Sequence, residues 1–174
     1  STTVPTVTTA GSYTVSIRAS KAGYAPKEIT KTVTVDPTGN TLTLSATTGT
    51  VKYPTAGTFT VTKNVSGGAL SVTSSNENVA TATISGTTVT ITPKVLTSDG
   101  QKVTITVKSA ATTNYKEATA TYTATVNRGT IELSATPYTG TYDGQAHDSL
   151  TINSKSPSDV TVKYALGDGE FTAE

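Results

Sequence analysis

The 174-residue sequence contains no cysteine, no methionine and no tryptophan, and its only histidine is His147. Without cysteine, the chain cannot form a disulfide, a thiolate metal site or a cysteine nucleophile. Without cysteine and methionine, it also lacks the side chains that oxidants modify most readily. These absences suit a protein exposed outside the cell, so we expect an extracellular location, either on a cell surface or secreted.

Charge and hydrophobicity are also low. Charged residues make up 14% of the chain and the formal net charge is +1, without a basic cluster, which argues against nucleic acid as a partner. No apolar run reaches the roughly 18 residues that a membrane-spanning helix needs, so we expect no membrane insertion in this segment. Hydrophobic residues account for 34%, below the usual share of about 45–50%, which predicts thin hydrophobic cores.

Threonine, in contrast, makes up about a quarter of the residues. Threonine is β-branched and favours a pleated, half-exposed surface. Apolar residues alternate with Thr, Ser or Lys in segments such as 13–17, 103–107 and 120–126. This period of two predicts strands with one face on a core and one face in water. Turn signals such as Gly67-Gly68 and Asp99-Gly100 separate the segments, so the sequence predicts an all-β chain of β-sandwich type.

The alternation also predicts which residues are buried. Each of them either occupies the apolar face of an expected strand or closes the end of a sandwich. The predicted core residues are Tyr13, Phe59, Val79, Ile84, Val89, Ile105, Tyr115, Tyr122 and Val126. Tyr13 also stands where a tyrosine corner is expected, with its hydroxyl bonded to nearby backbone.

An internal repeat divides the chain. The segment "TLTLSATTGT" begins at Thr41, and the similar "TIELSATPYTGT" begins at Thr130. Tyr24 and Tyr115 occupy matching places before later strands, with the same offset of about 90 residues. This offset is a usual size for one sandwich domain.

The phase of the repeat predicts three segments. We expect residues 1–37 to be the closing strands of one domain, 38–127 to be a complete domain and 128–174 to be the opening strands of a further one. The residues expected at the repeat or subunit junctions are Asp36, Asn40, Asn127 and Phe171.

The two outer segments are expected to complement each other. Read in the order tail then head, they give an uninterrupted domain, which suggests one period of a longer covalent array. Alternatively, separate subunits complete each other's half-domains through strand complementation, which would build a head-to-tail fibre. In both cases the partner is a neighbouring copy of the same repeat. A segment boundary unrelated to domains is the third possibility.

Residues 71–94, "SVTSSNENVATATISGTTVTITPK", resemble the bacterial immunoglobulin-like repeats of surface adhesins, of the group 2 type. The shared features are Ser-Ser-Asn at 74–76, Val-Ala-Thr at 79–81, a turn at Gly86 and the strand around Val89. The tryptophan that often precedes Ser-Ser-Asn in that family is missing here.

The outer segments resemble a sister repeat that begins with Tyr-Asp-Gly, here at 142–144, and ends with Gly-x-Tyr-Thr-Val, here at 11–15. The two resemblances imply tandem immunoglobulin-like β-sandwiches that form a structural stalk or fibre segment of a bacterial surface protein. Such repeats also occur on phage virion proteins. The alternative function is a ligand-binding adhesin module that recognises a glycan or a host protein.

The sequence does not point to an enzyme. His147 is followed directly by Asp148 and Ser149, and adjacent residues on a strand point to opposite faces, so the three cannot form a triad. We expect His147 to lie in a surface loop or strand, and we expect no catalytic residues.

Calcium sites at domain junctions need several oxygens that converge on one point. The junction residues Asp36, Asn40, Asn127 and Glu132 lack the D-x-D-x-D run that would supply them. Turn-forming or solvated side chains are the preferred interpretation. We therefore expect neither a metal ion nor a cofactor.

Related surface domains contain Lys–Asn isopeptide bonds, and Lys52, Asn127 and Glu117 are the residues that could form one here. They do not form a clear motif, and we expect solvated charges instead. A sugar site would need exposed aromatic rings, but Tyr24 and Tyr115 are expected to close the ends of their sandwiches. The sequence does not identify a host ligand.

Ile105 offers a direct test of the strand phase. If Ile105 faces the core, Ile105→Ala should lower the free energy of unfolding by about 2–5 kcal/mol, because it leaves a cavity. Thermal melts of the variant and the parent chain measure this difference. An unchanged melting temperature would show that the predicted inward face is wrong.

Overall fold

A computed structural model describes residues 3–173. The regular elements of these residues are all β-strands, which confirms the predicted all-β class. Within this described part, no helix is long and apolar enough to cross a membrane. The chain divides into two compact units, Ser1–Arg128 and Gly129–Glu174. Residues 1, 2 and 174, which belong to the predicted outer segments, lie outside the described residues.

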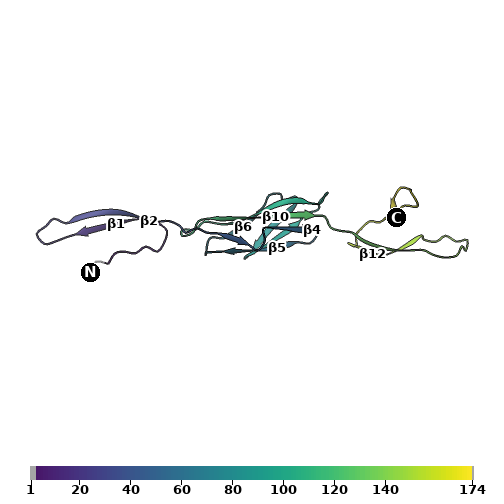
Figure 1. Cartoon of the computed structure of the whole chain (residues 1–174), viewed down its shortest axis with the longest axis horizontal. Coiled ribbons are helices and arrows are strands. Elements are labelled where there is room, and N and C mark those ends of the chain that lie inside the picture. Colours follow the sequence, from purple (N-terminus) through teal and green to yellow (C-terminus); the bar gives the residue numbers. More distant parts are fainter. Residues whose placement is uncertain (1–2, 174) are drawn as a thin grey trace. The chain divides into compact units, whose positions relative to one another are not determined.

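The larger unit contains a two-layer sandwich (Figure 1). Its strands are β3 (Leu42–Leu44), β4 (Thr48–Lys52), β5 (Gly57–Lys63), β6 (Leu70–Ser74), β7 (Ala80–Ser85), β8 (Thr88–Pro93), β9 (Gln101–Ser109) and β10 (Ala118–Asn127). One sheet has the order β4-β10-β9-β6 and the other has the order β3-β5-β8-β7. The sandwich architecture predicted from the alternating sequence is therefore present.

The core lies between these sheets and consists of alternate strand residues. The buried hydrophobic residues are Val51, Phe59, Val61, Val79, Ala80, Val89, Ile91, Val103, Ile105, Val107, Tyr122, Ala124 and Val126. Phe59 of β5 and Tyr122 of β10 come from opposite sheets, and their rings stack with centroids 4.4 Å apart and an interplanar angle of 7°. Stacked aromatic rings add to the energy of area burial, so this pair joins the two layers.

Six of the nine predicted core residues belong to this buried set. The other three, Tyr13, Ile84 and Tyr115, are only partly buried. Ile84 packs against the rim of the core on the edge strand β7. Tyr13 lies outside the sandwich, and its hydroxyl donates to the backbone oxygen of Thr9 at 2.9 Å, as expected for a tyrosine corner.

The chain crosses from one sheet to the other directly after β3. Ser45 still pairs with β5, through a bond from its backbone N–H to the oxygen of Thr60 at 2.9 Å. Two residues later, the oxygen of Thr47 accepts from the N–H of Thr123 at 2.8 Å, which begins the pairing with β10. After this crossing, β4 pairs in parallel with β10, the last strand of the sandwich.

The N-terminal part of this unit is a separate antiparallel hairpin of β1 (Gly11–Ala19) and β2 (Lys27–Val35). These strands form their own two-stranded sheet (Figure 1). Large apolar side chains on the hairpin stay exposed, including 52% of Ile17 and 45% of Ile29. The hairpin is therefore a strand pair without a second layer within its own unit.

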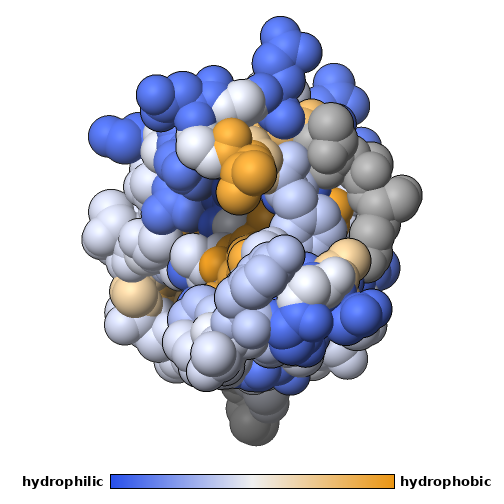
Figure 2. Space-filling model, turned by 90° about the vertical axis from the view of Figure 1, so that its right-hand side faces the viewer, coloured by the Kyte–Doolittle hydropathy of each residue, from blue (hydrophilic) through white to orange (hydrophobic). Residues whose placement is uncertain are grey.

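The smaller unit contains two short antiparallel pairs. Its strands are β11 (Glu132–Pro137), β12 (Leu150–Ser156), β13 (Lys163–Tyr164) and β14 (Thr172–Ala173). β11 pairs with β12, and β13 pairs with β14. Figure 2 is viewed from the side on which β12 is drawn, and it shows hydrophobic side chains in a hollow between hydrophilic ones.

The parallel closure of the sandwich requires a glycine at position 49. A Cβ atom on Gly49 would lie 2.0 Å from the hydroxyl oxygen of Tyr122. Gly49→Ala should therefore displace the Tyr122 ring from Phe59 and lower the free energy of unfolding by about 1–3 kcal/mol. Chemical denaturation measures the change.

The matched control is Gly39→Ala, because a Cβ atom there would meet no other atom within 4 Å. Equal stabilities for the Gly49 and Gly39 variants would contradict the proposed contact with Tyr122.

Candidate functional site

The chain enters the sandwich through a bonded segment, which we call the entry end (residues 36–41). The backbone N–H of Thr38 donates to the oxygen of Asn114 at 2.8 Å, and the N–H of Lys116 donates to the oxygen of Thr38 at 2.9 Å. The side-chain oxygen of Asn114 also accepts from the N–H of Ala10 at 2.8 Å. The connection between the hairpin and the sandwich is therefore fixed to the loop that precedes β10.

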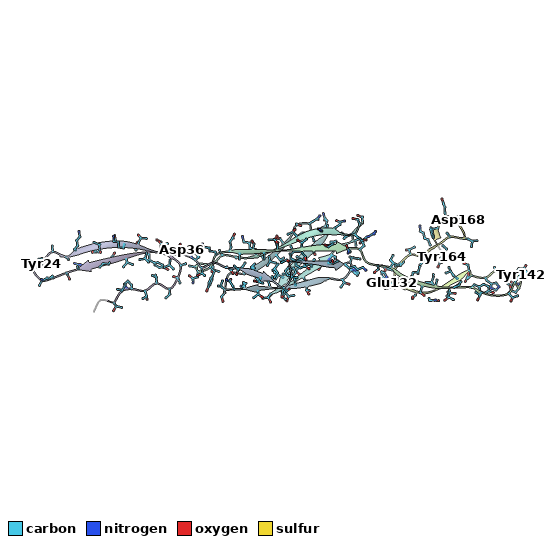
Figure 3. The ribbon with its side chains drawn as sticks, in the orientation of Figure 1. Tyr24, Asp36, Glu132, Tyr142, Tyr164 and Asp168 are labelled. Atoms are coloured by element: carbon cyan, nitrogen blue, oxygen red, sulfur yellow. The ribbon has the colours of Figure 1, made fainter. Side chains whose placement is uncertain are left out.

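Asn40, one of the predicted junction residues, lies inside the entry end. Its side chain is only 9% exposed, and its amide nitrogen donates to the hydroxyl of Ser109 at 3.0 Å. Ser109 donates in turn to the backbone oxygen of Gly68 at 3.3 Å. A Cβ atom on Gly67 would lie 2.6 Å from the Asn40 amide, so the β5–β6 loop closes tightly over this polar contact. Asn40 thus has a packing role, whereas Asp36 is exposed (Figure 3).

The chain leaves the sandwich through a second bonded segment, the exit end (residues 127–128). The side-chain oxygen of Asn127 accepts from the N–H of Gly100 at 2.8 Å, and its backbone oxygen accepts from the N–H of Tyr53 at 3.0 Å. The next residue, Arg128, donates from its backbone N–H to Asp99 at 2.7 Å and from its guanidinium at 3.2 Å. The predicted junction residue Asn127 therefore fixes β10 to two neighbouring loops.

The Asp99–Arg128 pair is exposed, with about half of each side chain in contact with solvent. The side-chain hydrogen bond from Arg128, followed by its backbone bond, lowers the pKa of the Asp99 carboxyl below its ordinary value. A solvent-exposed ion pair of this kind contributes little to stability by itself. Its effect is local, since it holds the first residue after β10 against the β8–β9 loop.

The residues considered for a junction cation do not come together. Asn40 contacts Ser109, which pairs with Ala118 at the start of β10, whereas Asn127 ends that strand. Asn40 and Asn127 therefore lie at opposite ends of the sandwich, and Glu132 belongs to the other unit. Within residues 3–173, no group of three or more His, Cys, Asp or Glu side chains could hold a metal ion.

The residues considered for an isopeptide bond are only partly assembled. Lys52 and Asn127 are partners in the parallel β4–β10 register. Glu117, however, precedes the start of β10 and forms an ion pair with Lys108 at 2.8 Å. The carboxylate that would promote the bond is thus at the other end of the strand from the Lys–Asn pair.

His147 lies in the loop between β11 and β12, where it contacts residues that the sequence did not single out. Its Nε2 atom lies 3.0 Å from a carboxylate oxygen of Asp143, and its ring stacks on Tyr138 with centroids 4.5 Å apart. The backbone N–H of Gln145, and then the His147 contact, lower the pKa of Asp143. The useful sequence signal was the Asp143-Gly144 turn, which brings residues 143 and 147 together.

Two aromatic residues with a position predicted from the sequence are exposed. Tyr24 lies at the tip of the β1–β2 hairpin (Figure 3), is 69% exposed and has the Lys21 ammonium 5.2 Å above its ring. Within the described residues it is exposed at a hairpin tip, so its expected position at the end of a sandwich stays a prediction. Phe171 is 72% exposed, so its assignment to a repeat junction stays a prediction.

The Ser-Ser-Asn motif has a structural role at the crossing from β6 to β7. The hydroxyl of Ser74 donates to the backbone oxygen of Ala80 at 2.7 Å, and the hydroxyl of Ser75 accepts from the N–H of Thr104 at 2.9 Å. Gly86 then turns the chain into β8 with a φ of 58°, a left-handed conformation that favours glycine. These residues therefore shape the crossing from β6 to β7 and the turn into β8.

Asp99→Asn should weaken the exit end in a pH-dependent way. The pKa of the Asp99 carboxyl is lowered in the folded chain. The stability that its ion pair with Arg128 provides is therefore present above the ordinary aspartate pKa of about 3.9, and it is lost as the pH falls through the folded pKa. We expect the variant to melt slightly below the parent chain at about pH 7, and the difference to be smaller at about pH 2.

The matched control for this experiment is Asp36→Asn, which removes one exposed carboxylate at the entry end. Melting curves at both pH values give the comparison. A difference between Asp99→Asn and the parent that is equally large in acid would rule out the ion pair as its source.

No family model matches this chain, and no curated protein matches it. Among solved structures, domains 4 and 5 of the S-layer protein SbsC are similar, with 26% identity, 68% of this chain and 58% of that chain covered, and a TM-score of 0.42. Domains 1–6 of the surface layer protein SbsC are also similar, with 20% identity, 95% and 29% of the two chains covered, and a TM-score of 0.44. The chain thus spans less than two thirds of the length of these structures.

Proposed function

We propose that this chain is a structural segment of a bacterial extracellular repeat protein and acts as part of a stalk or fibre. Residues 38–127 form its complete immunoglobulin-like domain, and residues 1–37 and 128–174 are parts of neighbouring domains. The observation that carries the proposal is the parallel pairing of β4, which follows the crossing between the sheets, with β10, the last strand of the sandwich.

This pairing determines how a pulling force acts on the sandwich. The chain enters beside the start of β10 and leaves at its end, so tension pulls β4 and β10 in opposite directions along their own axes. The register runs from Thr48 opposite Thr123 to Lys52 opposite Asn127. In this shear geometry all the bridging hydrogen bonds carry the load together, whereas a hairpin pulled apart loses its bonds one pair at a time.

Both ends of the sandwich transmit this load through hydrogen bonds. Thr38 is fixed to the loop before β10 at the entry end, and Asn127 and Arg128 are fixed to other loops at the exit end. Short, bonded connections limit rotation between a domain and the chain that leads into it. These features suit a protein that holds something at a distance from a surface.

We propose that the partners are neighbouring copies of the same repeat, arranged head-to-tail, in a covalent array or as separate subunits. The extracellular location, on a bacterial cell surface or secreted, follows from the absence of cysteine and methionine and from the resemblance of residues 71–94. A phage virion is the less favoured setting. The proposal includes no catalytic activity and no cofactor.

A ligand-binding adhesin module is the second candidate, and one loop favours it. Tyr142, between β11 and β12, is 93% exposed, and Tyr138 stacks on His147 in the same loop. Exposed aromatic rings provide surfaces on which a sugar or a protein side chain can pack. A glycan array probed with the chain and with Tyr142→Ala decides this point, since a module of this kind would lose binding in the variant.

Single-molecule force measurements test the structural function. The chain has no cysteine, so Thr81→Cys with Thr92→Cys provides two unique attachment points at the open end of the β7–β8 hairpin. We expect the sandwich to resist a several-fold larger force when pulled through the chain ends than when pulled through these two positions, because only the first direction shears β4 against β10. Equal unfolding forces in both directions would refute the mechanical role.

A further inference from the structure

The β1–β2 hairpin has one apolar face and one polar face. The register places Tyr13 opposite Val33 and Ile17 opposite Ile29 on one face. The pairs on the other face are all polar: Ser12 with Thr34, Thr14 with Thr32, Ser16 with Thr30 and Arg18 with Glu28. A sheet with such faces normally packs its apolar side on a second sheet. No such sheet covers the hairpin within its own unit, since 38–52% of the Val33, Ile29 and Ile17 side chains is exposed.

The smaller unit has a groove of mixed polar and apolar lining between β12 and the segment that follows it. Its apolar lining consists of Leu150, Ile152, Val160, Val162 and Tyr164, and polar side chains, among them Lys155, line the rest of it. Other large apolar side chains of the same unit are also exposed, with exposed fractions of 53% for Leu133 and 72% for Phe171.

The charges of the two surfaces are opposite. Residues 1–36 contain four basic and two acidic side chains, for a net charge of +2. Residues 129–174 contain two lysines and seven acidic side chains, for a net charge of −5. Two of the acidic residues, Asp148 and Asp159, lie along the groove itself.

Two lysines lie on the apolar face of the hairpin, Lys27 opposite Ala19 at its end and Lys31 further inside. Lys31 is opposite Val15, between the Tyr13–Val33 and Ile17–Ile29 pairs. Burying an ammonium group is costly unless a carboxylate receives it. A partner that covers this face must therefore be apolar and must also present an acidic side chain near its centre.

We infer that the apolar face of the β1–β2 hairpin packs into the groove of the smaller unit of a second copy of this chain, with Lys31 directed to the carboxylates of Asp148 and Asp159. The inference rests on the proposed head-to-tail arrangement and specifies the two surfaces that make it. Because the surfaces differ, each copy offers one of each, and the contact extends in one direction without closing a symmetric dimer. A two-stranded hairpin is only marginally stable alone, so the contact also completes its fold.

Sedimentation velocity of the intact chain, from about 1 μM to about 1 mM, tests the inference. We expect the average mass to rise above 17.8 kDa with concentration and to fall again in about 1 M salt, which screens the charges. Ile17→Asp should weaken association at least about tenfold, whereas Ser16→Asp, one residue away on the polar face, should leave it intact. Ile17 lies outside the sandwich, so thermal melts of the sandwich should be the same for both variants.

Charge-reversal variants test whether the hairpin binds in this groove. Lys31→Glu and Asp159→Lys should each weaken self-association, and an equimolar mixture of the two variants should restore it, because every contact in alternating order then joins opposite charges. A chain that is monomeric at all concentrations, equal effects of the Ile17 and Ser16 variants, or no recovery in the mixture would each overturn the inference. The force measurements on the sandwich do not depend on this contact, so the two proposals fail separately.

Discussion

Each strand pair in this chain has only one hydrophobic face, and the rest of the structure follows from that constraint. Threonine and serine fill the alternate positions, so a sheet must find a second sheet before it can bury anything. Between residues 42 and 127 it does, and thirteen hydrophobic side chains are buried. The β1–β2 pair and the smaller unit have the same two-faced pattern, but each keeps large apolar side chains in contact with solvent.

The way in which the sandwich closes connects its packing to its mechanics. Tyr122 reaches across from β10 to stack on Phe59, and it lies over Gly49 on the neighbouring strand. The same β4–β10 contact that accommodates this ring is the parallel pair along which tension would act. A compact core and a shear-loaded closure are therefore provided by one set of residues, and the polar contacts of Asn40 and Asn127 hold its two ends.

Alternation along the sequence was sufficient to predict the all-β class, and it selected Phe59, Ile105 and Tyr122, all of which the structure buries. It could not pair Asn40 with Ser109, which is 69 residues away, because a polar contact between distant segments leaves no local pattern. For the same reason, the alternation did not predict the ion pair between Asp99 and Arg128. Tyr24 was expected to close a sandwich end by analogy with Tyr115, but the repeat pattern did not reveal that its own hairpin lacks a covering layer within its unit.

One strand links the entry and exit contacts. β9 follows directly after Asp99 and Gly100, which bind the exit residues, and it ends at Ser109, which binds Asn40. Its 9 residues, at roughly 3.3 Å each, give a strut of about 30 Å. In a series of such domains, this strut would set a fixed increment of length for every sandwich, independent of how long the surface loops become.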